Sequence, residues 1–379
     1  MLELVSLSML ISPLSIDLVI ALTVVLTILA YVRRCKDLDA IVLSLTLLIL
    51  TKIGLSAVVS FTSIFILIGH RFVRGAISSI AVYFALSLTY LLYLNFFLNW
   101  EINYIVLLAL ISSLSASLME SIKAKPMLIL LSVSTSLAVF HVYALKVPLW
   151  QIALAFAVSF ILSLLALKAK VADESGLMSA TLVGLITIVY TDIRYFTVLL
   201  AFYVIGSAVT KYRYGLKVER GIAEQAGGAR GFANVFGNSL PALFFAMNYG
   251  VFKMDVFSVA FTTSIATALG DTMASEIGKT ADKVYLITNF KRVEPGESGG
   301  ISLIGEVSAL IGCFIVSFTA FLLGIVDLKG LIVATVFGFI GVHVDSLLGA
   351  TLEKKGILNN AGVNLLATLS SGLLALVIH

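Results

Sequence analysis

The sequence predicts an all-α protein, a polytopic bundle of about 13–14 transmembrane helices with its N-terminus outside. The first reason is composition, because 60% of the 379 residues are hydrophobic and only 12% are charged, whereas soluble domains carry about 25% charged residues. The second reason is the repetition of apolar stretches of about 20 residues, the length that crosses a membrane as a helix. These stretches are too long and too weakly alternating for the strands of a membrane barrel.

The connections between spans carry the basic residues in an alternating manner. One alternate set of connections holds 20 of the 25 Lys and Arg residues, which places that set in the cytoplasm by the positive-inside rule. Segment 39–70 must fit two spans around Lys52, and one long tilted helix or a re-entrant pair is the alternative. The expected spans are 14–32, 39–53, 55–70, 75–97, 102–119, 127–145, 149–167, 176–190, 194–210, 231–248, 256–274, 301–325, 330–350 and 361–378.

The first of these spans is expected to stay in the protein. It ends in Arg33-Arg34 and has neither a positive n-region nor a small-residue cleavage site, so it does not have the pattern of a cleaved signal peptide. The two cysteines, Cys35 and Cys313, are far apart and predict neither a disulfide framework nor a metal site. The net charge of +4 comes from loop residues and gives no indication of nucleic-acid binding.

The chain is expected to divide near residue 170 into two transmembrane domains. Residues 1–170 have few intramembrane charges and no recognisable role. Residues 171–379 contain four polar, Gly-rich islands, and ionisable residues at such depths are functional candidates. The islands are 211–238, 266–278, 293–306 and 341–364.

The first island opens with a basic cluster and continues into a Gly-rich segment. The cluster of Lys211, Arg213, Lys217 and Arg220 suits either anionic lipid headgroups or nucleotide phosphates, although the positive-inside rule alone also explains it.

The Gly-rich segment that follows is more specific. Gly227-Gly228 permits close backbone approach, and Arg230, Asn234 and Asn238 are spaced to share one face of a helix. This combination suits phosphate or nucleotide recognition, and interhelical hydrogen bonding by the asparagines is the alternative.

The second island places Asp271 deep in an apolar helix. Glu276 lies on a different side of that helix, so the two carboxylates would converge on one ion only if the helix breaks after Gly270. Such hard oxygen ligands suit Mg²⁺, which needs one or two carboxylates alongside substrate phosphates. The alternative for each carboxylate is a buried pair with a lysine.

The third and fourth islands complete a phosphate-type site. Gly296, Gly299 and Gly300 form a tight turn before a helix, whose exposed amides favour phosphate, although the lysine of a Walker A loop is absent. Asp345 lies one to two turns inside the membrane, with small residues beside it that allow close approach. Asn360 and Asn364 follow at helical spacing.

Together, the islands predict Mg²⁺-dependent phosphoryl transfer to a lipid at the cytoplasmic face of the cell membrane. Lys211, Arg230 and Asn234 would contact nucleotide phosphates, and Asp271, Asp345 and Glu276 would hold the metal. One rival is a transporter or lipid flippase, for which broken helices in two symmetric halves are typical. Another is a membrane cytidylyltransferase of the CDP-lipid type, which would release pyrophosphate from CTP.

Five ordered motifs resemble those of the phytyl-phosphate kinase family of integral-membrane enzymes over about residues 174–378. They are GLMSATLVG, GGARGFANVFGN, LGDTMASEIG, PGESGGISLIGEVSALIG and VDSLLGATLEKKG with the following asparagines. The sequence departs from the family pattern at Ala229, where a second arginine is usual, and at Met273, where tryptophan is usual.

The resemblance implies a CTP-dependent kinase that converts an isoprenyl monophosphate of the phytyl or geranylgeranyl type to the diphosphate. The expected cofactor is Mg²⁺, and the expected partners are nucleoside triphosphate, isoprenyl phosphate and membrane lipids. The resemblance supports these positions: Gly228, Arg230, Asn234, Asp271, Ser275, Glu276, Gly296, Ser298, Gly299, Ser302, Asp345, Ser346, Gly349, Asn360 and Asn364.

Overall fold

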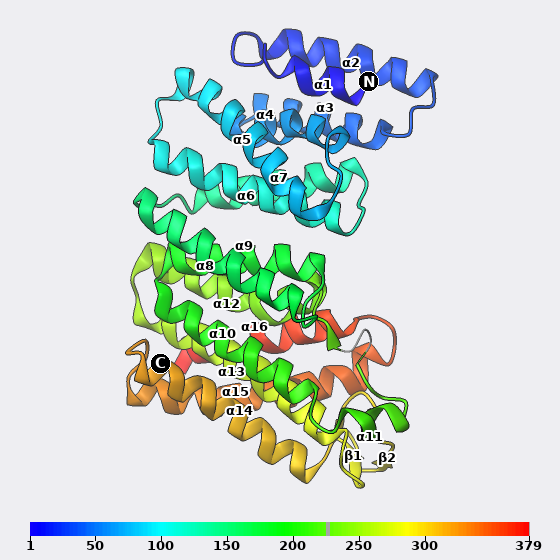
Figure 1. The fold of residues 1–379 in the computed structure, drawn as a ribbon, viewed down its shortest axis with the longest axis vertical. Helices are drawn as coiled ribbons and strands as arrows, with labels where there is room; N and C mark the ends of the chain where they lie inside the picture. Colours follow the sequence, from blue (N-terminus) through cyan, green and yellow to red (C-terminus); the bar gives the residue numbers. More distant parts are fainter. Residues whose placement is uncertain (225–227, 379) are drawn as a thin grey trace. The chain divides into compact units, whose positions relative to one another are not determined.

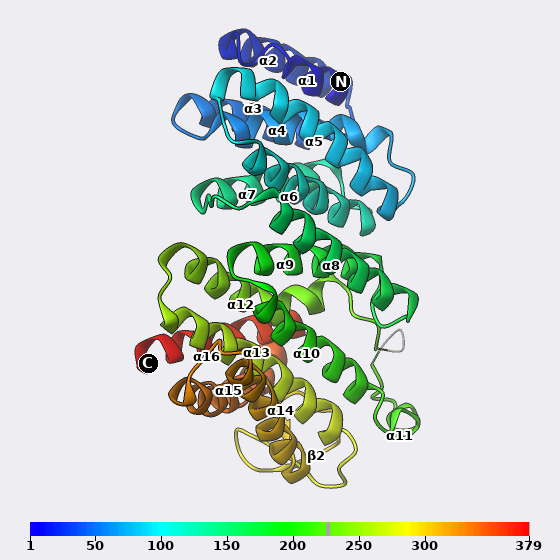
Figure 2. The same ribbon diagram turned by 60° about the vertical axis from the view of Figure 1, so that its left-hand side comes forward.

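A computed structural model describes residues 1–224 and 228–378, and within this part the chain forms sixteen α-helices (Figures 1 and 2). Each of the expected spans corresponds to one of these helices, which confirms the all-helical membrane class. Of the described helices, seven are both long and apolar enough to cross a membrane. The chain forms two compact units, Met1–Ala157 with Leu177–Leu182, and Val158–Gly176 with the residues from Val183 onward.

The first unit is a helical bundle in which one helix, α6, is almost wholly buried. Segment 39–70 forms two separate helices rather than one long tilted helix, because the chain breaks at Gly54, whose φ is +125°. The second of these has ten residues, so it rises only about 15 Å. The elements are α1 (Leu2–Ser8), α2 (Ile16–Val32), α3 (Leu38–Lys52), α4 (Ala57–Ile66), η1 (Leu67–Arg71), α5 (Ala76–Leu98), α6 (Ile102–Ser121), α7 (Pro126–Val142) and the start of α8 (Leu149–Lys168).

The second unit is built around one central helix, α13, which packs against α10, α12, α14, α15 and α16. Its elements after α8 are α9 (Glu174–Tyr190), α10 (Ile193–Thr210), α11 (Tyr214–Glu219), α12 (Phe232–Phe252), α13 (Asp255–Gly278), β1 (Val284–Leu286), β2 (Arg292–Val293), β3 (Gly300–Ile301), α14 (Leu303–Leu322), α15 (Leu328–Leu348), η3 (Gly349–Glu353) and α16 (Asn360–Ile378).

Small and hydroxyl residues allow α13 to have so many neighbours. A Cβ on Gly312 of α14 would lie only 3.0 Å from the Cα of Gly270, so these two backbones are nearly in contact. Thr267 donates a hydrogen bond of 2.7 Å to the hydroxyl of Ser371 on α16. Close backbones and interhelical hydroxyl bonds are the usual means of packing helices in a membrane.

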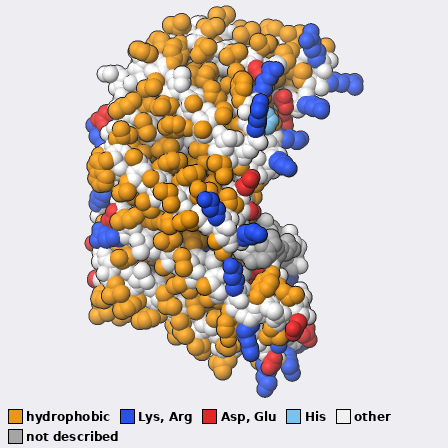
Figure 3. Space-filling view, viewed as in Figure 1, with side chains coloured by type: hydrophobic (Ala, Val, Ile, Leu, Met, Phe, Trp, Pro, Cys, Tyr) orange, Lys and Arg blue, Asp and Glu red, His pale blue; other side chains and the backbone are white. Residues whose placement is uncertain are grey.

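The polar islands of the second unit come together at one end of its helices. The connections after α10, α13 and α15 all contribute to this end. Charged side chains are visible around α11 and β1, whereas apolar side chains cover the helices (Figure 3). A small antiparallel sheet of order β2-β1-β3 pairs Val284 with Val293 and Tyr285 with Ile301. The sequence did not predict this sheet, because its strands are only two or three residues long.

Candidate active site

A polar cavity of ≈ 600 Å³ lies at this end of the second unit, a size typical of small-ligand sites. Lys211 is exposed and is not among the described residues that line the cavity, so the structure does not bring it to the other site residues. The predicted site residues that line the cavity are Gly228, Arg230, Asn234, Asn238, Asp271, Glu276, Gly296, Ser298, Gly299, Gly300, Ser302, Asp345, Asn360 and Asn364. Gly227 lies outside the described residues.

Two aspartates from different helices face each other in the cavity. The carboxyl groups of Asp271 on α13 and Asp345 on α15 lie close enough to interact directly. With its carboxamide nitrogen turned toward Asp345, Asn364 donates to Oδ2 of that aspartate at 3.1 Å and accepts from Asn238 at 3.3 Å. Two carboxylates this close repel each other unless a proton or a cation lies between them.

This arrangement fits Mg²⁺ bound together with a phosphate ligand. Among the described residues there is no group of three or more His, Cys, Asp or Glu side chains that would hold a metal by themselves. Mg²⁺ commonly takes only one or two carboxylates and completes its shell with water and substrate phosphate. Asp271 and Asp345 are therefore sufficient as its protein ligands.

Arg230 is a buried cation without an ion pair among the described residues. Its side chain is only 8% exposed, and the guanidinium carbon lies 5.0 Å from the ring centre of Phe202 and 5.6 Å from that of Tyr203. In the described part of the chain, its Nη1 and the carboxamide oxygen of Asn234 have no hydrogen-bond partner. Because a buried unpaired charge is costly, the Nη1 donor of Arg230 indicates an anionic ligand, whereas the oxygen of Asn234 can only accept a hydrogen bond.

The fold fixes the position of Arg230 through backbone contacts. Its amide donates to the carbonyl of Val171 at 3.0 Å, and its carbonyl accepts from the amide of Asp173 at 3.2 Å. The guanidinium lies over Gly206, where a Cβ would be 2.5 Å from Nη2. Burial lowers the pKa of Arg230, but an arginine in a protein remains charged.

The turn at 296–300 has the expected form. Gly296 and Gly299 have φ values of +88° and +78°, which favour glycine. The turn packs against the end of α15, where the chain continues as the single π-helical turn η3. Ser302 caps α14, its hydroxyl accepting from the amide of Gly305 at 3.2 Å. Ser302 thus lies in the cavity at the N-terminus of a helix, a position suited to phosphate.

We expect Gly299→Ala to disrupt this turn and to lower activity. Its new Cβ would clash with Ala350 and would lie 2.6 Å from the carbonyl oxygen of Ser346. Gly356→Ala is the matched control, because Gly356 has a similar φ of +69° but no atom within 4 Å of the added Cβ. The control should cost only about 1–2 kcal/mol from its backbone conformation. Equal thermal stability and activity of the two variants would contradict the expectation.

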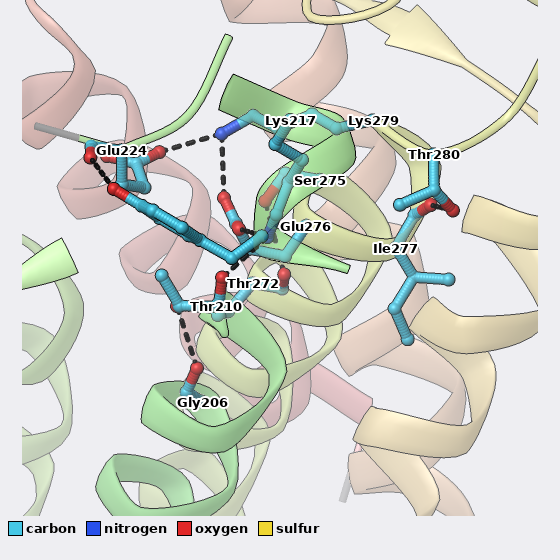
Figure 4. A network of polar contacts seen from close by, with 11 residues as sticks. Gly206, Thr210, Lys217, Glu224, Thr272, Ser275, Glu276, Ile277, Lys279 and Thr280 are labelled. Atoms are coloured by element: carbon cyan, nitrogen blue, oxygen red, sulfur yellow. Dashed lines mark hydrogen bonds and ion pairs between the residues drawn. The ribbon is translucent and has the colours of Figure 1, made fainter. Parts of the chain in front are cut away.

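Glu276 lies in a chain of buried ion pairs (Figure 4). Lys217 is fully buried and donates to the carbonyl of Thr210 at 2.5 Å and to Oε2 of Glu276. Lys279 donates to Oε1 of Glu276 and to Oε1 of Glu224, both at 2.7 Å. Burial opposes the charge of Lys279, but the two carboxylates together raise its pKa.

These ion pairs correct the metal role expected for Glu276. The break after Gly270 that this role requires is absent, because α13 continues from Asp255 to Gly278. Both carboxylate oxygens of Glu276 meet lysine ammonium groups. The structure thus favours the alternative, in which Glu276 is a charge partner of the lysines.

Two members of the basic cluster, Lys217 and Arg220, dock the 211–224 segment onto the end of α13. Arg220 donates to the carbonyls of Lys279 at 3.0 Å and Ala281 at 2.8 Å, and to Asp282 at 2.9 Å. Sequence reasoning did not single out Lys279 or Glu224. The only signal was the i, i+3 spacing of Glu276 and Lys279, which is compatible with an ion pair.

The fold and the site define an integral membrane protein with a polar cavity at one end of a helical bundle. The chain belongs to the family described as integral membrane protein DUF92, whose pattern matches residues 157–372. It is 32% identical to an uncharacterized membrane protein of Methanocaldococcus jannaschii over 220 residues, which is 58% of this chain and 90% of the relative.

Two further relatives have the same level of identity. An uncharacterized membrane protein of Synechocystis is 32% identical over 202 residues, 52% of this chain and 78% of the relative. The chloroplastic protein VTE6 of Arabidopsis thaliana is 32% identical over 203 residues, 51% of this chain and 61% of the relative. No solved structure matches the chain.

Proposed function

We propose that this protein is a kinase that transfers the terminal phosphoryl group of a nucleoside triphosphate, CTP by preference, to an isoprenyl monophosphate. The observation that carries this proposal is the buried Arg230, whose Nη1 has no hydrogen-bond partner in the described part of the chain, in the same cavity as the facing Asp271 and Asp345. The membrane location supports a lipid acceptor. The motif resemblance to the phytyl-phosphate kinase family supports an isoprenoid acceptor.

The reaction exchanges one phosphorus–oxygen bond for another. The bond from the γ-phosphorus to the bridging oxygen breaks, and the nucleoside diphosphate leaves with that oxygen and its electron pair. An oxygen of the acceptor phosphate forms the new bond, which gives the isoprenyl diphosphate. The acceptor is already ionised, so positioning and charge neutralisation are the main requirements.

The residues of the chain have separate tasks in this scheme. Asp271 and Asp345 would hold Mg²⁺, and Asn364 orients Asp345. Bound Mg²⁺ would neutralise charge on the donor phosphates. The 296–300 turn would bind phosphate through the amides other than those of Glu297 and Gly300, which already donate to backbone carbonyls of Glu294 and Glu297. Arg230 would neutralise a second anionic group.

We assign catalysis to residues 171–379, with the role of 1–170 open. The lining residues all lie between Thr210 and Asn364, and the M. jannaschii relative contains little beyond what it shares with this chain. The loops around the cavity belong to the more basic set of connections. By the positive-inside rule, these loops would lie on the cytoplasmic side of the cell membrane, and the cavity would open to the cytoplasm.

Nucleotide protection tests the donor site. CTP with Mg²⁺ should raise the melting temperature of the purified protein, because a ligand at 100 times its Kd stabilises by about 2.7 kcal/mol. Chelation of the metal should cancel most of this rise, because the two aspartates repel the phosphates unless a cation lies between them. If CTP, ATP, GTP and UTP all leave the melting temperature unchanged over a range of Mg²⁺ concentrations, the proposal fails.

A further inference from the structure

Two different parts of the cavity wall are suited to bind phosphate, one beside α12 and the other beside α14. One is Arg230 with the N-terminus of α12, and the other is the 296–300 turn with the N-terminus of α14. Helix α13, which carries Asp271, packs against both α12 and α14. Phosphoryl transfer needs a donor and an acceptor phosphate that approach the reaction centre from different sides.

The two features differ in their surroundings. Gly296 and Glu297 of the turn are exposed, so a nucleotide can reach this flank from water. Arg230 is buried against Phe202, Tyr203 and Gly206 of the membrane helix α10. This flank is therefore less open to water than the turn.

We propose, on the basis of the kinase function above, that Arg230 binds the phosphate of the lipid acceptor, whereas the turn binds the nucleotide. The planar guanidinium can make two parallel hydrogen bonds to a phosphate. The N-cap of α12 is Gly231, which has no side chain of its own, and the hydroxyl of Ser175 accepts from the first-turn amide of Phe232 at 3.0 Å. The carboxylate of Asp173 also lies beside Gly231, so Arg230, rather than the helix N-terminus, provides the positive charge at this place.

The helix that follows Arg230 also presents apolar side chains on its outer surface. Leu240 and Phe244 of α12 lie beyond Asn234 along the helix and are 44% and 45% exposed. A surface of this kind at membrane depth contacts hydrocarbon. A nucleotide at Arg230 would instead have to place its ribose and base against α10 and α12.

Separate Michaelis constants for the two substrates test this assignment. In the full chain reconstituted in nanodiscs, Arg230→Gln should raise KM for geranylgeranyl monophosphate about ten- to hundred-fold, because it removes charge-assisted hydrogen bonds. KM for CTP should change less than about twofold. Ser298→Ala should give the reciprocal pattern. Arg213→Gln makes the same charge change on an exposed side chain of the same segment and should leave both constants unchanged.

The outcomes separate this assignment from the kinase proposal itself. A rise in KM for CTP without a rise for the acceptor would overturn the assignment and leave the kinase intact. If Arg230→Gln does not fold, Arg230→Lys, which keeps the charge but loses the planar fork, should show the same split with a smaller rise. If the wild type forms no diphosphate, the kinase proposal fails. The subsite is then decided by whether geranylgeranyl monophosphate alone raises the melting temperature. If it stabilises the wild type but not the Arg230 variant, the assignment is supported. If it does not stabilise the wild type, the assignment is overturned.

Discussion

Asp271→Asn is expected to lower kcat by at least about 10³-fold, equivalent to about 4 kcal/mol of activation free energy. The substitution removes the charge that holds the metal but changes the side-chain volume little. Its fold should be preserved, because an asparagine amide can donate to Asp345 where two carboxylates now face each other. Loss of the metal's charge neutralisation accounts for the size of the effect.

The measurement is turnover at saturating CTP and acceptor, together with the melting temperature of the variant. Asp255→Asn is the matched control, since Asp255 is an exposed residue in the first turn of the same helix. That control should retain full activity. A kcat near the wild-type value for Asp271→Asn would remove this residue from the site.

Lys217→Met is expected to destabilise the protein by about 3 kcal/mol or more. It removes one partner of a buried ion pair and leaves the Oε2 atom of Glu276 without its ammonium partner. Loss of one partner of a buried pair typically costs about 3–5 kcal/mol. Lys279 still contacts the other oxygen of Glu276, so the lower end of this range applies. The double variant Lys217→Met/Glu276→Gln should recover most of the loss.

Thermal and denaturant unfolding in the same detergent compare these variants. Lys211→Met is the control, because Lys211 is an exposed lysine of the same connection and its loss should have little effect. Wild-type stability of the Lys217 single variant would show that the ion pair does not hold the segment onto α13.

Much of the fold follows from the sequence, because hydrocarbon allows few alternatives to the helix. Each expected span formed a helix, and Gly54 explains why segment 39–70 forms two. The end of α13 was harder to place. The helix extends to Gly278, beyond the expected 274, because the charged residues of its last turn find partners in the 211–224 segment.

The candidate site was predictable to the extent that polar residues in apolar spans are themselves a signal. Asp271, Asp345 and Arg230 were identified in this way. The roles of Lys217 and Glu276 depend on how the 211–224 segment packs against α13, and no local pattern contains that information. For the same reason, exposed Lys211 could not be distinguished from buried Lys217 within one basic cluster.

Product analysis with labelled CTP tests the central claim most directly. The full chain in nanodiscs would be incubated with Mg²⁺, an isoprenyl monophosphate, and CTP labelled at either the α- or the γ-phosphorus. We predict that only γ-label enters the lipid, as isoprenyl diphosphate, with one CDP formed for each lipid product. Transfer of the α-label to the lipid with release of pyrophosphate would contradict the kinase and identify a cytidylyltransferase, and absence of any transfer from CTP, ATP, GTP or UTP would contradict phosphoryl transfer altogether.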